Sequence, residues 1–308
     1  MKIYSQILVA LLIASVVFTS CEEVINPDLQ EADAELVVEA WLNNKPEDQV
    51  INLMMTQPYF ESTTPPGVSG AVVTVQDSEG EVMNFVEDVD QKGNYRWSPS
   101  IPGETFGIIG RGYALTVSYK GETFESVSYM GRVPVIDSIS VIFEESSPFY
   151  PANSYSCEFW ANDLPGSGDA YWIKTIKNDT LLNKPSEISL AFDAGFSQGG
   201  NFDGIAFLPP IRTSVNPFNE DADGNLVSPY LPADSIYVEI HSITYETFTY
   251  LNQVVVQTNR PGGFGELFSS PLSNVSTNIF NVNPKGSKVV GFFNVAAVSG
   301  LGKKVKEN

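Results

Sequence analysis

The sequence predicts a mainly β protein, with two β-rich bodies in series and about one amphipathic helix. Three observations indicate this class. Many short segments alternate apolar and polar residues with a period of two, as strands with one buried face do. Clusters of glycine, proline, asparagine and aspartate separate these segments and are typical of turns. Clear helical spacing of apolar residues appears in one stretch, which begins at Tyr245.

The first body is expected over residues 36–132 as a β-sandwich. Turns such as Pro65-Pro66-Gly67 and Lys120-Gly121 separate its expected strands. The run Gly70-Ala71-Val72-Val73-Thr74-Val75, with Gly80 and Gly93-Asn94-Tyr95 after it, resembles immunoglobulin-like and prealbumin-like modules. The strands of this body are expected at 36–42, 50–56, 71–76, 82–87, 113–120 and 122–129.

The second β-rich body is expected over residues 133–300. Pro134 stands between two valines and marks the start of a new extended segment. A helix is expected from Tyr245, capped by Ser242 or Thr244 and ended before Pro261. A solvated basic tail is expected over 301–308. The strands of this body are expected at 139–143, 155–161, 171–177, 236–243 and 289–298.

Composition excludes several classes of function. The 308 residues include 37 acidic and 17 basic side chains, which gives a net charge of −20. That charge argues against nucleic acid as a partner, because basic patches supply most of the affinity for phosphates. The single histidine excludes metal sites that need two. An apolar fraction of 43% shows that the chain is not a disordered acidic tail.

The first 20 residues are expected to be a signal peptide. Their only charge is Lys2, and the apolar run 7–18 is too short to span a membrane. The run ends in Phe18-Thr19-Ser20-Cys21, which resembles the lipobox of bacterial lipoproteins, so Cys21 is predicted to carry lipid. An ordinary signal peptide cut elsewhere, or a core helix, is the alternative. Residues 21–35 are then the lipid anchor and an acidic spacer.

The acidic pair Glu22-Glu23 directly follows the predicted lipid attachment. It resembles the surface-export signal of Bacteroidota lipoproteins, and the alternative is a plain acidic tether.

Cys157 and His241 are residue types that can act in catalysis. Cys157 lies on the apolar face of its expected strand and is interpreted as a buried core residue, since no basic residue nearby in sequence could activate it as a nucleophile. No disulfide is expected if Cys21 carries lipid. His241 shares a strand face with Tyr237 and Glu239. We interpret it as a half-exposed histidine, and a general base paired with Glu239 is the alternative.

The most unusual stretch is 195–232, which is rich in glycine, proline, asparagine, aspartate and aromatic residues. A connection this long is usually functional or mobile. We predict that it binds a polar ligand, a divalent cation or a partner. Part of it resembles the first half of a calcium loop, but Tyr230 stands where the bidentate glutamate belongs. A plain acidic turn is preferred, so no metal or cofactor is assigned and calcium remains the alternative. The candidate residues are Asp203, Arg212, Asp221, Asp223 and Asn225.

Two weaker sets of candidates concern sugars. Trp41, Trp97, Trp160 and Trp172 could stack on a saccharide or simply fill a core. Three Asp-Ser/Thr-aliphatic triplets resemble the O-glycosylation sequon of Bacteroidota secreted proteins, although aspartate and serine also favour the start of a strand after a turn. Their acceptor residues are Ser138, Thr180 and Ser235.

An ordered set of motifs along the mature chain is similar to a family of Bacteroidota lipoproteins, the domain of unknown function 4249. The set includes Leu36-Val37-Val38-Glu39-Ala40, Thr56-Gln57-Pro58-Tyr59-Phe60, Val135-Ile136-Asp137-Ser138-Ile139 and Gly291-Phe292-Phe293-Asn294-Val295. The family has no established activity and no catalytic residues to transfer. The sequence departs from the pattern at Phe18, Ala40 and Ala71.

The resemblance implies a role at the outer membrane, because members are often encoded beside TonB-dependent receptors. The hypothesis is a non-enzymatic, lipid-anchored protein on the extracellular face of the outer membrane. It would serve as an accessory or ligand-capturing subunit of a TonB-dependent β-barrel receptor. The first alternative is a structural or adhesive surface lipoprotein. The second is a hydrolase with a carboxylate pair, for which the many acidic residues offer no specific candidate.

Overall fold

The computed structural model describes residues 33–58 and 61–306. The predicted signal peptide, Cys21 and the pair Glu22-Glu23 lie outside these residues and stay predictions. From Ala34 onward the chain forms one compact unit. No helix in the described residues has the length and apolar character needed to cross a membrane.

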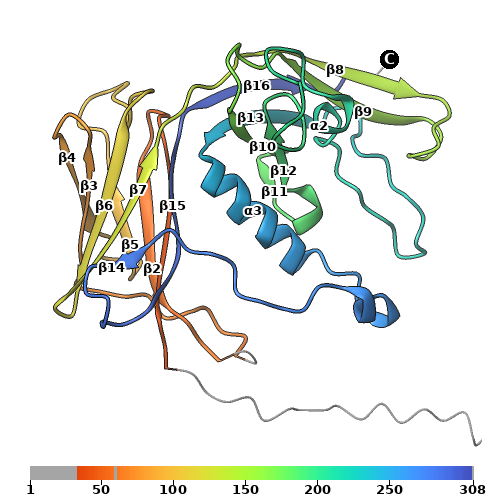
Figure 1. The fold of residues 1–308 in the computed structure, drawn as a ribbon. Coiled ribbons are helices and arrows are strands. Elements are labelled where there is room, and N and C mark those ends of the chain that lie inside the picture. Colours follow the sequence, from red (N-terminus) through yellow and green to blue (C-terminus); the bar gives the residue numbers. More distant parts are fainter. Residues whose placement is uncertain (1–32, 59–60, 307–308) are drawn as a thin grey trace, which may run out of the picture. The chain divides into compact units, whose positions relative to one another are not determined.

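The chain is mainly β, as predicted (Figure 1). The strands that build the first sheet up to the predicted domain boundary are β1 (Leu36–Asn43), β2 (Gln49–Met55), β3 (Val72–Asp77), β4 (Val82–Glu87), β5 (Asn94–Trp97), β6 (Gly112–Tyr119) and β7 (Glu122–Tyr129). The later strands are β8 (Ile136–Glu144), β9 (Ser154–Ala161), β10 (Ala170–Lys177), β11 (Thr180–Leu182), β12 (Ser189–Phe192), β13 (Ser235–Ile243), β14 (Phe280–Asn281), β15 (Val289–Ala296) and β16 (Val298–Lys304). The helices are α2 (Pro209–Arg212) and α3 (Tyr245–Thr258), with short 3-10 turns η1 (Pro185–Glu187) and η2 (Gly263–Phe268).

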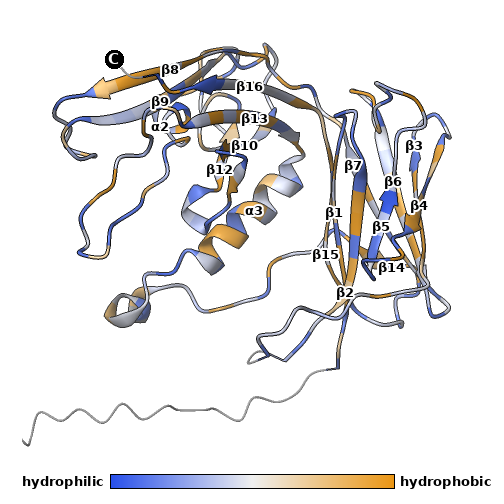
Figure 2. Ribbon diagram, turned by 180° about the vertical axis from the view of Figure 1, so that it is seen from behind, coloured by the Kyte–Doolittle hydropathy of each residue, from blue (hydrophilic) through white to orange (hydrophobic). Residues whose placement is uncertain are grey.

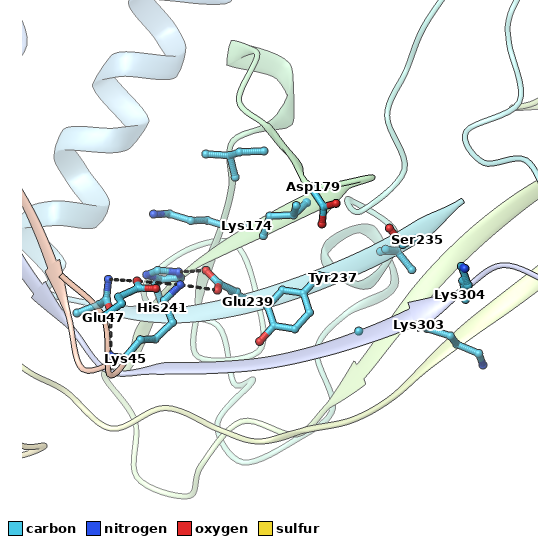
Figure 3. A pocket seen from close by; sticks show the side chains of 15 residues that line it. Lys45, Glu47, Lys174, Asp179, Ser235, Tyr237, Glu239, His241, Lys303 and Lys304 are labelled. Atoms are coloured by element: carbon cyan, nitrogen blue, oxygen red, sulfur yellow. Dashed lines mark hydrogen bonds and ion pairs between the residues drawn. The ribbon is translucent and has the colours of Figure 1, made fainter. Parts of the chain in front are cut away.

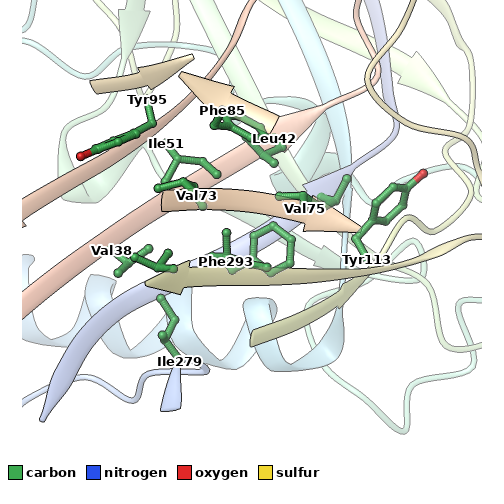
Figure 4. Close-up of a cluster of buried hydrophobic side chains, with 14 of the residues drawn as sticks. Val38, Leu42, Ile51, Val73, Val75, Phe85, Tyr95, Tyr113, Ile279 and Phe293 are labelled. Atoms are coloured by element: carbon green, nitrogen blue, oxygen red, sulfur yellow. The ribbon is translucent and has the colours of Figure 1, made fainter. Parts of the chain in front are cut away.

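A nine-stranded sheet in the order β14-β7-β6-β3-β4-β5-β2-β1-β15 builds the first body. Alternate residues of its strands point to one side, where they form a single core (Figure 4). Val38 and Leu115 come from different strands of this sheet, and both are fully buried in that core. The strands predicted from the period-two pattern are therefore present, and each of them buries one face.

The C-terminal part of the chain returns to this first sheet. β15 pairs with β1 in parallel, with Leu36 opposite Val289, and β14 pairs with β7. The predicted boundary at residues 132–133 lies between β7 and β8, but β14 and β15 fall on the other side of it in sequence. The predicted second body, residues 133–300, is therefore not separate from the first, because its strands β14 and β15 belong to the nine-stranded sheet. Strand pairing between residues far apart in the chain leaves no local sequence signal.

The predicted basic tail also differs from the structure. Residues 301–304 belong to β16, which pairs with β13, and Val305 is only 2% exposed. The backbone of Val305 is held by hydrogen bonds with Ala233 and Asp234. Lys303 and Lys304 at the end of this strand are exposed, so their charges stay in solvent while the backbone pairs with β13.

Two further sheets lie beside the first. β8 and β9 form a two-stranded sheet, and the order β11-β10-β13-β16 forms a larger one that also carries β12. These two sheets enclose a second core, in which Cys157, Phe159 and Tyr171 are fully buried. The interpretation of Cys157 as a core residue is confirmed, and burial raises the pKa of its thiol to about 12.

The predicted amphipathic helix is α3. The side chain of Thr244 caps it by accepting a hydrogen bond from the backbone N–H of Thr247 at 3.1 Å. Phe248 and Leu251 on its inner face pack against one end of the five-stranded sheet, with Phe192 from β12. Apolar residues are visible along this helix in Figure 2. The helix therefore covers only part of one sheet face.

Candidate functional site

One face of the five-stranded sheet carries the best candidate site. The opposite face is apolar and packs on the second core through residues such as Ile173 and Val238. Strand alternation places a second set of side chains together on the open side, because β10 and β13 pair in register. In register order from one end, the facing pairs of this set are Ala170 with Ile243, Trp172 with His241, Lys174 with Glu239, and Ile176 with Tyr237.

The character of this face changes along the strands. At one end, Ala170 and Ile243 are buried under α3. In the middle, Trp172 packs edge-on against Trp41, with ring centroids 5.5 Å apart. Trp41 also contacts Tyr250 of α3 and Phe292 of β15, whose own rings are 4.2 Å apart. The face is covered from Ala170 and Ile243 up to this aromatic cluster, and we call this part the covered half.

The other half is open and lines a pocket of about 700 Å³ (Figure 3). Lys45 reaches it from the turn between β1 and β2, and its ammonium lies 3.0 Å from Oε1 of Glu239 and 3.1 Å from Glu47. His241 Nε2 lies 2.8 Å from Oε2 of Glu239. Both carboxylate oxygens of Glu239 are therefore occupied. Glu239 and His241 are each 6% exposed, so this network is fixed in place.

The turn that carries Lys45 is itself held by hydrogen bonds. Asn44 donates from its backbone N–H to Ala296 at 3.2 Å, and its side-chain oxygen accepts from the N–H of Val298 at 2.9 Å. Gln49 is 2% exposed and bonds back to Asn43 and Glu47. The position of Lys45 over Glu239 thus depends on the junction of the two sheets.

Burial and charge set the protonation states of this network. Burial alone would raise the pKa of Glu239, but the hydrogen bond from His241 and the ammonium of Lys45 lower it to about 2. Burial lowers the pKa of His241 to about 4, and the bond to Glu239 only partly opposes this. At neutral pH Glu239 is therefore ionised and His241 is neutral, so Nε2–H donates to the carboxylate.

Lys174 differs from Lys45 because no carboxylate in the described part of the chain lies within ion-pair distance of it. Its ammonium lies 4.0 Å from the centre of the Trp172 ring, and among residues 33–58 and 61–306 it makes no ion pair or hydrogen bond. Burial lowers the pKa of Lys174 to about 8. Buried charges are normally paired, so an unpaired lysine in a pocket is unusual.

Tyr237 forms the floor of the open half beside β16. The strand carries glycine at positions 300 and 302, and a Cβ built on Gly300 would lie 2.4 Å from Oη of Tyr237. On Gly302 it would lie 3.0 Å from Cδ2 of the same ring. The ring therefore rests on the backbone of β16. Tyr237 remains 41% exposed, so it offers an open surface within the pocket lining.

The charge of the pocket is opposite in sign to that of the protein. Four of the 17 basic residues of the chain line it, but only three of the 37 acidic ones do. The basic residues are Lys45, Lys174, Lys303 and Lys304, and the acidic ones are Glu47, Asp179 and Glu239. Such a lining suits binding of an anionic group.

The predicted half-exposed state of His241 is wrong, because the residue is buried under the network. The alternative pairing with Glu239 is present. A histidine with a pKa near 4 is a weak general base at neutral pH. Glu239, with both oxygens occupied and a pKa near 2, is a poor general acid.

The predicted ligand segment 195–232 lies elsewhere and contributes largely to the core. Phe207, Val215 and Tyr230 are fully buried, and Tyr230 donates a hydrogen bond to the carbonyl of Val215. The side chain of Asn216 bonds both the N–H and the C=O of Cys157. The expectation that this composition suits a ligand better than a core is wrong for these aromatic residues, since the segment satisfies its own polar groups.

The polar candidates of that segment are held at separate places. Asp203 accepts from the N–H of Gly166, and Arg212 lies over the Trp160 ring and 3.7 Å from Glu158. Asp221 accepts hydrogen bonds from Asp223 and Asn225 within its own turn. In the described residues no group of three or more histidine, cysteine, aspartate or glutamate side chains could hold a metal ion. Ligand binding by these residues stays a prediction.

The glycosylation candidates are accessible to different degrees. Ser138 and Thr180 are exposed, whereas Ser235 is half-buried and hydrogen-bonded to Asn178. Modification of these residues stays a prediction.

Of the four tryptophans, Trp41 and Trp172 belong to the aromatic cluster, and Trp97 packs on Phe106 with ring centroids 5.3 Å apart. Trp160 is 36% exposed, but Arg212 covers one face of its ring.

Lys45 and Lys174 are site residues that were not expected from the sequence. A signal for Lys174 was available, because a charged residue between Trp172 and Ile176 on one face of a strand is unusual in a buried sheet. Lys45 had no such signal, since its contact with Glu239 joins residues almost 200 positions apart.

The sequence was compared with models of known protein families. The family model described as Domain of unknown function (DUF4249) matches residues 22–300. No curated protein matches the chain.

Proposed function

The chain belongs to the family described as Domain of unknown function (DUF4249), and we propose that it is a lipid-anchored outer-membrane protein that captures a ligand. It would act on the extracellular face, without enzymatic activity, as an accessory subunit of a TonB-dependent receptor. The pocket on the open half of the five-stranded sheet is the capture site in this proposal.

The observation that carries the proposal is the fixed and open pocket itself. Its volume of about 700 Å³ lies in the range of sites for small molecules. Lys45, Glu239 and His241 are held by contacts within the protein, so this part of the pocket needs little ordering on binding. The features that support surface anchoring are the lipobox-like end of the signal segment and the acidic pair Glu22-Glu23.

Binding is favoured over the hydrolase alternative by the protonation states. Glu239 is ionised and fully engaged, and His241 is too weak a base for efficient proton transfer at neutral pH. These two residues stabilise the pocket rather than transfer protons. The purely structural or adhesive alternative would leave the unpaired Lys174 without a role.

The experiment is extraction of native membranes with a mild detergent and affinity purification of the full chain. We expect a β-barrel receptor to co-purify, and we expect Cys21→Ala to release the protein from the membrane fraction. Recovery of the lipidated protein without any β-barrel partner would contradict the accessory role. Unchanged membrane retention of correctly processed Cys21→Ala would contradict lipid anchoring.

A further inference from the structure

We propose that the pocket binds an organic anion, a ring-bearing carboxylate whose acid group pairs with Lys174 and whose ring stacks on Tyr237. This inference rests on the proposed ligand capture and adds the chemical class of the ligand. It follows from three features of the open half: an unpaired cation, an aromatic surface backed by glycine, and the local sign of charge.

The first feature is the unpaired ammonium of Lys174. Lys45 lines the same pocket and makes two ion pairs, at 3.0 and 3.1 Å, whereas Lys174 makes none among the described residues. Lys174 stands directly opposite Glu239 in the strand register, yet Glu239 is fully used by Lys45 and His241. Lys174 therefore has no ion-pair partner among the described residues, and a bound anion could fill that place.

The second feature is the aromatic surface of Tyr237. The ring of Tyr237 occupies the space that side chains at positions 300 and 302 would fill, so its lower side is covered by β16. Tyr237 sits next to Glu239 on the same strand face and is therefore one register step from Lys174. A ring placed on Tyr237 could reach Lys174 with an attached acid group. Flat surfaces of this kind bind the faces of sugar or aryl rings.

The third feature is the excess of basic residues in the pocket lining. Lys304, which is exposed at the far end beside Ser235, adds a second cation. Lys303 is engaged with the carbonyl of Ile139 at 2.6 Å. Asp179 is the acidic group at that end. An anion would gain from Lys174 and Lys304, whereas a cation would meet an ammonium that makes no ion pair among the described residues.

Two classes of ring fit this chemistry, and the test separates them. The full-length protein is titrated calorimetrically with trigalacturonate and with salicylate, each compared with its neutral counterpart, galactotriose or 2-hydroxybenzyl alcohol. We expect one of the acids to bind and its neutral counterpart to bind much more weakly. Binding of trigalacturonate assigns an acidic sugar, and binding of salicylate assigns an aryl acid.

Variants then connect the binding to Lys174. Lys174→Met should weaken the bound acid by about 10- to 100-fold, as loss of a charged hydrogen bond does. Lys285→Met is the matched control, because Lys285 is exposed outside the pocket, and it should leave the affinity unchanged. The melting temperature of free Lys174→Met should stay close to that of the parent, because removal of a partly buried ammonium offsets the loss of its contact with the Trp172 ring.

Several outcomes would overturn the inference. One is equal binding of a neutral counterpart, which would leave ligand capture intact but refute the anionic class. A second is the absence of binding by both acids at millimolar concentration. A third is a melting temperature of Lys174→Met several degrees below that of the parent, because the ammonium would then be a structural group. Co-purification with a β-barrel receptor tests the proposed function separately and does not depend on these results.

Discussion

The two halves of one face of the five-stranded sheet differ in what covers them. Both halves use the same strands, β10 and β13, and the same ladder of hydrogen bonds. The half at Ala170 and Ile243 is apolar and lies under α3, whereas the half at Lys174 and Tyr237 is charged and open. Side chains whose burial stabilises the fold and side chains that we propose to bind a ligand thus lie only a few residues apart on the same strands.

The largest expected effect concerns the covered half. Leu251 is 3% exposed and joins α3 to the sheet. Leu251→Ala should reduce the free energy of unfolding by about 2–5 kcal/mol, because it removes packed methyl groups and leaves a cavity. Chemical denaturation measures this, with the exposed helix residue Val256 changed to alanine as the control. Equal losses for both variants would mean that α3 does not hold the covered half.

The next effect lies where the halves meet. Glu239→Gln should cost about 1–3 kcal/mol of stability, because Lys45 loses a charged acceptor in a largely buried place. The same denaturation experiment applies, and Glu79→Gln is a control for loss of an exposed acidic charge. A neutral result for Glu239→Gln would show that the network is not a structural anchor of the pocket.

The protonation of His241 predicts a pH dependence. Its folded pKa is about 4 and its ordinary value is 6.5, so the unfolded chain binds the proton more readily. Stability should therefore fall as pH decreases from 6.5 to 4, by up to about 1.2 kcal/mol per pH unit. Glu239, with a folded pKa near 2, adds a loss between pH 4.5 and 2.

The pH series isolates His241 when it is compared with His241→Gln, which keeps a donor for Glu239 but cannot titrate. The charged groups that face His241 are Glu239, Lys174 and Lys45. The difference between parent and variant should shrink below pH 6.5. A difference that stays constant from pH 7 to 4 would refute the neutral, buried state.

The smallest effect on stability belongs to the open half. Tyr237 is 41% exposed, so Tyr237→Leu should change the free energy of unfolding by about 0.5 kcal/mol or less. Binding of a ring-bearing acid, measured by calorimetry, should nevertheless weaken. A large loss of stability would place Tyr237 with the covered half and sharpen the boundary between the two.

The sequence predicted the elements of this face better than their partners. Alternation along 171–177 and 236–243 placed Glu239 and His241 on one side, and it separated them from the apolar side. It could not show that Lys45 would neutralise Glu239, because that contact depends on how the two sheets meet. It also could not show that His241 would be buried, since burial follows from the aromatic cluster around Trp172.

The segment 195–232 illustrates a different limit. Its glycines and prolines predicted a loop, and the structure contains little regular structure there beyond α2. Composition did not reveal that Phe207 and Tyr230 fill the second core. A loop enters a core when its polar groups find partners. Here Tyr230 donates to the carbonyl of Val215, and the side chain of Asn216 bonds the backbone of Cys157 in β9.

The parallel pairing of β1 with β15 has a consequence for the order of folding. Leu36 lies opposite Val289, so β1 keeps an unpaired edge until residues 289–296 have been synthesised. Contacts between such distant segments form slowly, because a long loop must close before they contribute. A chain that stops short of β15 would expose that edge to other strands and would aggregate rather than fold. Pairing of β15 with β1 is therefore required to complete the first sheet.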